Sequence, residues 1–156
     1  MLLQNTFRMI TFKPLTHCDI DFMASLIRDF YAIDNYPFDI DHSKILLQEF
    51  ISNENYGKTW LILSENEIVG YVILTFVFSF EYQGRIAFLD ELYLVEKSRG
   101  KGIGKQTIDF IKNESHKLSL KLIYLEVEHH NEKAQKLYLS ADFELHNRLL
   151  MRYKIK

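Results

Sequence analysis

The sequence has little cysteine, little proline and no long apolar run. Cys18 is the single cysteine among 156 residues, so no disulfide can form within the chain, and we expect a reducing compartment. The longest apolar segment, 71–80, is far shorter than the roughly 20 residues that a membrane helix needs. Its β-branched and aromatic residues instead predict a buried strand. The N-terminus shows no pattern of a secretory signal, so we expect a cytoplasmic protein without a membrane partner.

An excess of charge of one sign is also absent. The chain has 19 Lys and Arg against 21 Asp and Glu, a formal net charge of -2, and no nucleic acid is expected as a partner. The histidines follow neither H-x-x-x-H nor H-E-x-x-H, and we predict no catalytic metal. There are no repeats or linkers, and with 47% hydrophobic residues the sequence suits one domain over 1–156.

Three of the six glycines are concentrated in Arg99-Gly100-Lys101-Gly102-Ile103-Gly104. They allow the backbone to fold tightly and to turn successive N–H groups toward one point. An amphipathic helix is expected to begin here, and its first N–H groups lack partners and carry partial positive charge. Lys105 adds a full charge. The pattern predicts an anion-binding loop, with a plain strand-to-helix turn as the alternative; it matches neither G-x-x-x-x-G-K-[ST] nor G-x-G-x-x-G.

Two motifs resemble those of the GCN5-related N-acetyltransferase (GNAT) family. Arg99-x-x-Gly102-x-Gly104 after an apolar strand resembles [RQ]-x-x-G-x-[GA], the segment with which that family binds the pyrophosphate of acetyl-coenzyme A. Asn131-x-x-Ala134-x-x-Leu137-Tyr138, followed by Phe143, resembles the family's downstream helix at the expected distance. The resemblance is clearest over 70–143. It implies an acetyl-coenzyme A dependent N-acetyltransferase with a β-α-α-β-β-β-α-β-α-β-β order and a central, mixed, splayed sheet.

The hydrophobic pattern agrees with a mixed α/β fold. Strands are predicted over 7–15, 58–64, 67–80, 85–95, 121–128 and 149–156, and helices over 16–32, 41–52, 104–118 and 131–141. Short turns join the second, third and fourth strands, which should therefore form an antiparallel meander. The fourth and fifth strands are joined through a helix and should be parallel, with a right-handed crossover.

The resemblance also implies where the cofactor binds. The pyrophosphate would lie on backbone amides between Arg99 and Gly104, with Arg99 and Lys105 as charge partners. Backbone groups of Leu92 and Leu94 would pair with the pantetheine amides as if these were an extra strand, and N–H groups near Leu92 could polarise the thioester oxygen. The expected cofactor-binding residues are Leu92, Tyr93, Leu94, Arg99, Gly100, Lys101, Gly102, Ile103, Gly104, Lys105, Asn131, Ala134, Leu137 and Tyr138.

Asp90 and Glu91 are the candidate proton acceptors. An alkylammonium has a reference pKa of about 10.4, so its proton must be removed before it attacks a thioester. Adjacent residues of a regular strand face opposite sides, so only one carboxylate can enter the cleft. Asp90 shares parity with Leu92 and Leu94 and matches an acid found in relatives that acetylate polyamines or aminoglycosides. A bulge in the strand would reverse this parity and favour Glu91, and in a third alternative both are structural and water takes the proton.

Tyr138 matches the family tyrosine that hydrogen-bonds the sulfur and protonates the departing thiolate. Its reference pKa of about 10 exceeds that of a thiol, about 8.5, so the phenol keeps its proton at neutral pH. Core packing is the alternative for this tyrosine. One residue departs from the family pattern: Asp142, where a glycine usually precedes the aromatic residue Phe143. Aspartate can take the left-handed conformation of such a helix end at a cost of about 1 kcal/mol.

Aromatic residues lie between the first two predicted helices, where the resemblance implies a variable substrate pocket. They are Tyr31, Tyr36 and Phe38, with core or loop packing as the alternative. Glu81, together with Asp39 and Asp90, is a candidate to bind a second cationic group, with a solvated turn as the alternative. These acids favour a small primary amine of cationic or polyamine-like character as the acceptor. A non-catalytic acyl-coenzyme A sensor and an enzyme for protein amines are rival functions, and monomer and homodimer both remain open.

Overall fold

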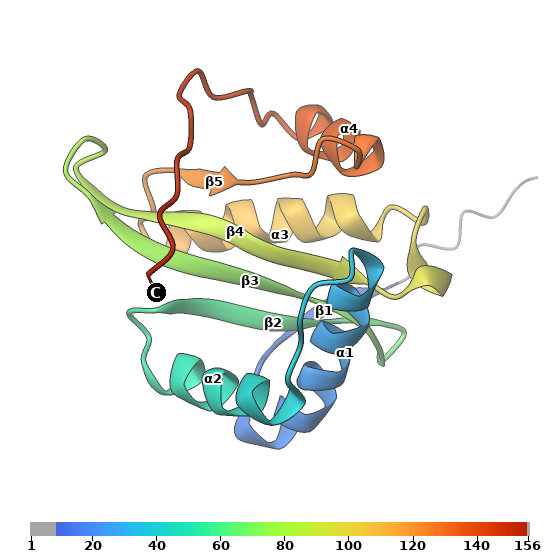
Figure 1. Ribbon diagram of the computed structural model, residues 1–156. Coiled ribbons are helices and arrows are strands. Elements are labelled where there is room, and N and C mark those ends of the chain that lie inside the picture. The colour runs from blue at the N-terminus through green and yellow to red at the C-terminus, as the bar shows by residue number, and fades with distance from the viewer. Residues whose placement is uncertain (1–8, 156) are drawn as a thin grey trace, which may run out of the picture. The chain divides into compact units, whose positions relative to one another are not determined.

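The structure is a computed structural model that describes residues 9–155. Two predicted strands extend beyond this range: the one over 7–15 at its start and the one over 149–156 at its last residue. By internal contacts the chain divides into two compact units, Met1–Glu126 and Val127–Lys156. The first unit contains one five-stranded sheet in the order β1-β2-β3-β4-β5 (Figure 1). Its strands are β1 (Ile10–Pro14), β2 (Gly57–Ser64), β3 (Glu67–Ser79), β4 (Gly84–Leu94) and β5 (Ile123–Leu125).

The sheet is mixed, as predicted. Strands β1 to β4 pair antiparallel in chain order, and β5 pairs parallel with β4. Strand β5 is shorter than the predicted 121–128, because its pairing with β4 covers only Ala87–Leu89 against Ile123–Leu125. The mixed α/β fold class is therefore confirmed, with a shorter fifth strand.

Four α-helices accompany the strands: α1 (Ile20–Ile33), α2 (Ile40–Ser52), α3 (Ile103–Lys117) and, in the second unit, α4 (Glu132–Ser140). The capping interaction predicted at Thr16 and Asp19 is present, because Oδ2 of Asp19 accepts hydrogen bonds from the backbone N–H of Thr16, at 3.1 Å, and from its hydroxyl, at 2.6 Å. A 3-10 turn at His17–Asp19 leads directly into α1. Among the described residues, no helix combines the length and the apolar character that crossing a membrane would require.

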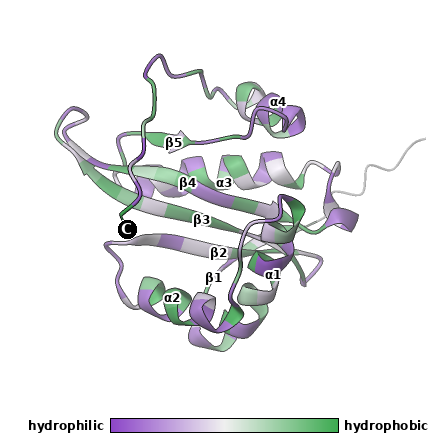
Figure 2. Cartoon of the chain, in the orientation of Figure 1, coloured by the Kyte–Doolittle hydropathy of each residue, from purple (hydrophilic) through white to green (hydrophobic). Residues whose placement is uncertain are grey.

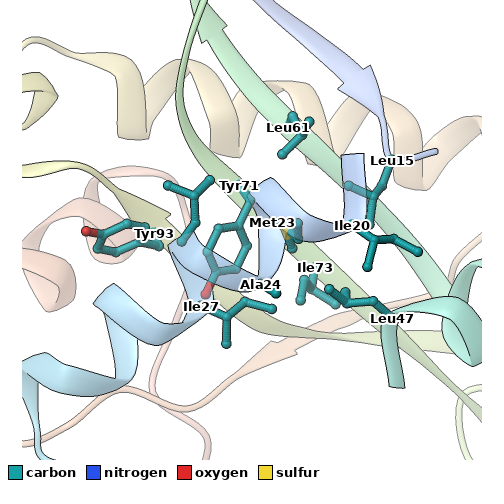
Figure 3. Close-up of a cluster of buried hydrophobic side chains, with 11 residues drawn as sticks. Leu15, Ile20, Met23, Ala24, Ile27, Leu47, Leu61, Tyr71, Ile73 and Tyr93 are labelled. Atoms are coloured by element: carbon teal, nitrogen blue, oxygen red, sulfur yellow. The ribbon is translucent and has the colours of Figure 1, made fainter. Parts of the chain in front are cut away.

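Helices cover both faces of the sheet in the first unit. On one face, buried residues of α1 and α2 pack against β2, β3 and β4; Figure 3 shows Met23, Ala24, Ile27 and Leu47 near Leu61, Tyr71, Ile73 and Tyr93. On the other face, Phe110 of α3 stacks on Phe12 at 4.0 Å and meets Trp60 edge-on at 5.2 Å. Figure 2 shows the corresponding pattern, with hydrophobic colour along much of β3 and alternating colour along α3.

The second unit contains α4 with both ends fixed by side-chain and backbone hydrogen bonds. Oδ1 of Asn131 accepts from the backbone N–H of Ala134 at 3.1 Å, which confirms the predicted cap. At the other end the N–H groups of Phe143 and Asp142 donate to the carbonyls of Tyr138 and Leu139, at 3.1 and 3.3 Å. This is a Schellman motif, and the φ of Asp142 is 64°, the left-handed conformation expected at this position.

The closing strand predicted over 149–156 is not formed in residues 149–155, and this part of the predicted element order is wrong for the described residues. The alternation is present, but a strand is stabilised by a paired edge and by burial of one face. Here Leu149 is 93% exposed and Met151 is 87% exposed. Periodicity alone therefore could not decide whether the segment finds a partner.

Candidate active site

The glycine loop connects the end of β4 to α3 through two left-handed residues. After a 3-10 turn at Glu96–Ser98, Gly100 has a φ of 71° and Gly102 a φ of 78°. Gly102 caps α3, and the helix begins at Ile103. A Cβ built on either glycine would meet no atom within 4 Å, so the backbone of the loop faces open space. Gly104 lies within the first turn of the helix.

Arg99, expected to bind the cofactor, is held against the end of β4. Its Nε donates to the carbonyl oxygen of Leu94 at 2.8 Å, and its guanidinium lies 5.6 Å from the centre of the Tyr93 ring. Lys101 donates to the backbone carbonyl of Lys97. The loop thus fixes two cations beside the start of α3, where the helix dipole already favours an anion.

The parallel strands part next to this loop. Their pairing ends at Leu89 and Leu125, whereas β4 continues to Leu94. The N–H of Val95 donates to the carbonyl of Val69 at 2.9 Å, so by antiparallel alternation Leu92 and Leu94 turn their backbone groups to the opposite edge. In the described part of the chain no strand pairs with this edge at Leu92 and Leu94, which is where the GNAT resemblance places pantetheine.

Strand β4 contains a β-bulge at Asp90. Leu89 pairs with Leu74 and Glu91 pairs with Ile73, so Asp90 has no partner in the ladder with β3. The regular alternation assumed for Asp90 and Glu91 is therefore interrupted between them. Asp90 is exposed. Partial desolvation and, to a smaller degree, the charge of Glu126 raise the pKa of the Asp90 carboxyl.

Both carboxylate oxygens of Glu91 are occupied by phenols. Oε1 accepts from the hydroxyl of Tyr31 in α1 at 2.7 Å, and Oε2 accepts from the hydroxyl of Tyr71 in β3 at 2.6 Å. Burial raises the pKa of Glu91, the two phenol hydrogen bonds oppose this rise, and the charge of Asp90 adds to it, so the pKa is raised overall. Burial and the Glu91 carboxylate raise the pKa of both tyrosines, which stay neutral donors.

The predicted aromatic loop lies next to this carboxylate. Tyr36 and Phe38 each meet the ring of Tyr31 edge-on, with centroid distances of 6.0 and 5.8 Å. Tyr31 and Phe38 are partly buried against the core, whereas Tyr36 is 50% exposed. Three of the predicted acceptor residues therefore form one cluster, and Tyr31 connects that cluster to Glu91.

Of two further acids proposed for the acceptor, Glu81 lies far from Glu91 and Asp39 caps a helix. Glu81 lies in the turn between β3 and β4, and the eight residues from Gly84 to Glu91 place it roughly 20 Å away along the strand. Asp39 is the N-cap of α2, because its Oδ1 accepts from the backbone N–H of His42 at 2.9 Å. The predicted grouping of Glu81 with Asp90 therefore does not hold, whereas the grouping of Asp39 with Asp90 stays a prediction. Across residues 9–155, no three His, Cys, Asp or Glu side chains gather as a metal site would require.

Comparison with known proteins decides the family. The model of the Acetyltransferase (GNAT) family matches residues 21–143, most of the chain. The chain belongs to the GNAT family. The N-acetyltransferase YhfO of Bacillus subtilis, which is uncharacterised, is 35% identical over 92 residues, 58% of this chain, and the aligned part spans only 62% of the YhfO length.

Solved structures show the same GNAT fold. A possible acetyltransferase from Clostridium difficile 630 superposes with a TM-score of 0.84 at 20% identity, over 94% of this chain and 98% of the other. A predicted acetyltransferase with acetyl-coenzyme A from Clostridium acetobutylicum has a TM-score of 0.78 at 16% identity, over 93% and 96% of the two chains. At these identities the likeness concerns the fold.

In the second unit, Tyr138 of this GNAT chain lies in the last turns of α4. Its ring meets that of Phe143 at 5.8 Å, at an angle of 61°. Burial raises the pKa of Tyr138 to about 12, so the phenol keeps its proton at neutral pH. Of the other residues expected on this helix, Asn131 and Ala134 form the cap, and Leu137 is partly buried.

Tyr71 is a neighbour of the candidate residue Glu91 that the sequence did not indicate. It stands in an apolar run that predicts only a buried strand, and its side chain is 0% exposed. Figure 3 shows its ring near Ile27, within the core. Its hydroxyl reaches a carboxylate 20 residues further along the chain. A tyrosine in place of an aliphatic residue within such a run was the available signal, because a buried hydroxyl needs a hydrogen-bond partner.

Proposed function

We propose that this protein transfers an acetyl group from acetyl-coenzyme A to a small primary amine. The observation that carries the proposal is the open glycine backbone at Gly100 and Gly102, which begins a helix beside an unpaired edge of β4. Membership of the GNAT family and the acetyl-coenzyme A in the structure from Clostridium acetobutylicum support it.

The first unit offers the groups that acetyl-coenzyme A needs. N–H groups at the start of α3, with Arg99 and Lys105 nearby in sequence, suit the pyrophosphate. Backbone groups of Leu92 and Leu94 suit the amides of pantetheine, because they point to a part of the β4 edge that no described strand occupies. The cofactor supplies the thioester carbonyl that the amine attacks.

Asp90 is the proposed proton acceptor. It lies at the bulge, immediately after the residues where β4 and β5 part, and it is exposed to an incoming amine. Its raised pKa brings the carboxylate closer to the working range of a general base. Glu91 is less suited to this role, since both of its oxygens already accept hydrogen bonds from phenols.

The proposed reaction needs a proton acceptor for the amine and a proton donor for the departing thiolate. The amine nitrogen forms a bond to the acetyl carbon, and the carbon–sulfur bond breaks. From the ammonium to the amide the nitrogen loses two protons, of which Asp90 takes one and solvent the other. We assign the proton that neutralises the departing thiolate to Tyr138, on its match to the family tyrosine and on its partly buried, protonated phenol. A non-catalytic binder would have little use for such an acid.

The acceptor is proposed to be small, because Tyr31, Tyr36 and Phe38 form one aromatic cluster beside Glu91. The carboxylate at this position favours a cationic amine. An enzyme for protein amines would need an open groove at the same place, and it remains the rival enzymatic function.

The test is release of coenzyme A thiol from acetyl-coenzyme A across a panel of amines and peptides, with calorimetry for coenzyme A binding. We expect binding and turnover with at least one small amine. Binding without turnover on any amine or peptide would favour the rival function, a non-catalytic acyl-coenzyme A sensor. Absence of binding would overturn the whole proposal.

A further inference from the structure

We propose that Glu91 binds a second ammonium group of the acceptor, so that the preferred substrates are diamines rather than monoamines. This inference rests on the proposed acetyl transfer. It states that the acceptor has a second positive charge, at a distance from the reacting nitrogen. Two adjacent carboxylates then have different roles: Asp90 is the proton acceptor, and Glu91 is the specificity-determining residue.

The first argument is that Glu91 has no counter-charge of its own. Its two hydrogen bonds, at 2.7 and 2.6 Å, come from neutral phenols, and in residues 9–155 no Lys, Arg or His pairs with it. A partly buried carboxylate without a cation is costly, and a ligand that supplies the cation recovers that cost on binding. Each carboxylate oxygen still has a lone pair that an ammonium N–H can use.

The second argument is the character of the side chains around Glu91. Tyr31 donates to the carboxylate and also meets the rings of Tyr36 and Phe38 at 6.0 and 5.8 Å. Aromatic faces attract an alkylammonium, and half of the Tyr36 side chain is accessible to one. A carboxylate next to aromatic rings suits a cation with an apolar alkyl chain better than it suits a strongly hydrated polar group.

The third argument is the end of α1. Tyr31 lies in the last turn of this helix, which ends at Ile33 and contains no basic residue in that turn. The carbonyl end of a helix carries partial negative charge, and nothing cationic in the last turn neutralises it. The potential around the Tyr31–Glu91 pair is thus negative from the backbone as well as from the side chain.

The bulge explains why one molecule could use both acids. Asp90 and Glu91 are consecutive, yet only Glu91 keeps a partner in the ladder, while Asp90 is the extra residue that the bulge accommodates. A diamine could place its reacting nitrogen at Asp90 and its other ammonium at Glu91. A monoamine of the same length would leave the charge of Glu91 without a partner.

The experiment compares kcat/KM for three acceptors of equal length: 1,4-diaminobutane, 4-amino-1-butanol and n-pentylamine. Diamines with two to six methylenes then set the optimal spacing. For the wild-type protein we expect kcat/KM to be at least tenfold higher for the best diamine than for the two monoamines. Equal values for the three acceptors would overturn the inference while leaving the acetyl transfer intact, whereas no turnover on any amine would refute the proposed function itself.

The variant Glu91→Gln should reduce the diamine preference at least fivefold and change turnover of 4-amino-1-butanol less than threefold. Glu65→Gln, in the exposed turn between β2 and β3, is the matched control and should retain the preference. An equal loss on all three acceptors would assign Glu91 to folding or to the chemical step and would overturn the inference. Should Glu91→Gln fail to fold, Tyr36→Leu replaces it, and a diamine preference in that variant equal to the wild-type preference would count against the site.

Discussion

The hydroxyl of Tyr71 in β3 donates a hydrogen bond of 2.6 Å to Oε2 of Glu91 in β4. Glu91 pairs across the ladder with Ile73, two residues after Tyr71, so the bond runs diagonally between neighbouring strands. It ties a fully buried ring to the first residue after the bulge. The position of Glu91 therefore depends on a residue of the core.

We expect Tyr71→Phe to lower the free energy of unfolding by about 1.5–3 kcal/mol, the range for a hydrogen bond to a charged group. Denaturant unfolding at neutral pH measures it. The matched control is Tyr82→Phe, which removes the 2.7 Å bond between the hydroxyls of Tyr82, in the turn between β3 and β4, and Tyr124 of β5, and should cost only about 0.5–1.5 kcal/mol. A loss no greater than that of the control would show that the Glu91 bond adds no charge-assisted stability.

The pH dependence of turnover tests Asp90. Activity should rise with pH as the Asp90 carboxyl loses its proton, and since the charge of Glu126 raises that pKa, Glu126→Gln should move the rise to lower pH. Asp90→Asn should abolish the rise and most of the activity. A profile of kcat/KM against pH for both variants is the measurement, and an unmoved rise in Glu126→Gln would point to another proton acceptor.

The glycine loop is tested by Gly102→Asn. Asparagine tolerates the left-handed φ of 78°, so stability should change by less than about 1 kcal/mol, but its side chain would occupy the open space at the loop. We expect at least a tenfold loss of affinity for coenzyme A by calorimetry. Ser119→Asn, at a φ of 55° elsewhere in the chain, is the control and should bind normally. Normal binding by Gly102→Asn would remove the loop from the cofactor site.

Asp142→Gly should raise the free energy of unfolding by about 1 kcal/mol, because glycine adopts the φ of 64° without strain. Asp142→Ala should lower it, since alanine lacks the tolerance of aspartate for this conformation. Thermal denaturation of both variants provides the measurement. A lower melting temperature for the glycine variant would contradict the assigned Schellman end of α4.

Tyr138→Phe should lower kcat by about 10²–10⁴, the range for loss of a general acid, while coenzyme A affinity changes less than threefold. Tyr153→Phe serves as control, because Tyr153 is 84% exposed in the C-terminal segment. Steady-state turnover and calorimetry together separate the two effects. Unchanged kcat in Tyr138→Phe would return this tyrosine to a packing role.

The features predicted best from the sequence are those that depend on local interactions. The Asn131 cap, the left-handed Asp142 and the parallel connection from β4 to β5 are each determined within a few residues or by one crossover. The bulge at Asp90 could only be stated as an alternative, because it depends on the register between β3 and β4.

Contacts between distant segments were harder to predict. Glu81 and Asp39 are acids, as Asp90 is. The length of β4 separates Glu81 from Glu91, and the carboxylate of Asp39 caps α2. The Tyr71–Glu91 bond joins residues whose patterns predict only burial and a strand. The prediction of a closing strand was wrong for residues 149–155, because alternation of apolar and polar residues indicates which side of a strand is apolar but not which strand it pairs with.

The contact of Arg99 with the Leu94 carbonyl and the Tyr93 ring has an entropic consequence. When an anion immobilises a free arginine side chain, the loss of rotamer entropy costs as much as about 2 kcal/mol of free energy. In this chain that loss is already incurred on folding, so arrival of a diphosphate should leave the guanidinium where it stands. Dissociation of the nucleotide would then return a preorganised loop to the next catalytic cycle.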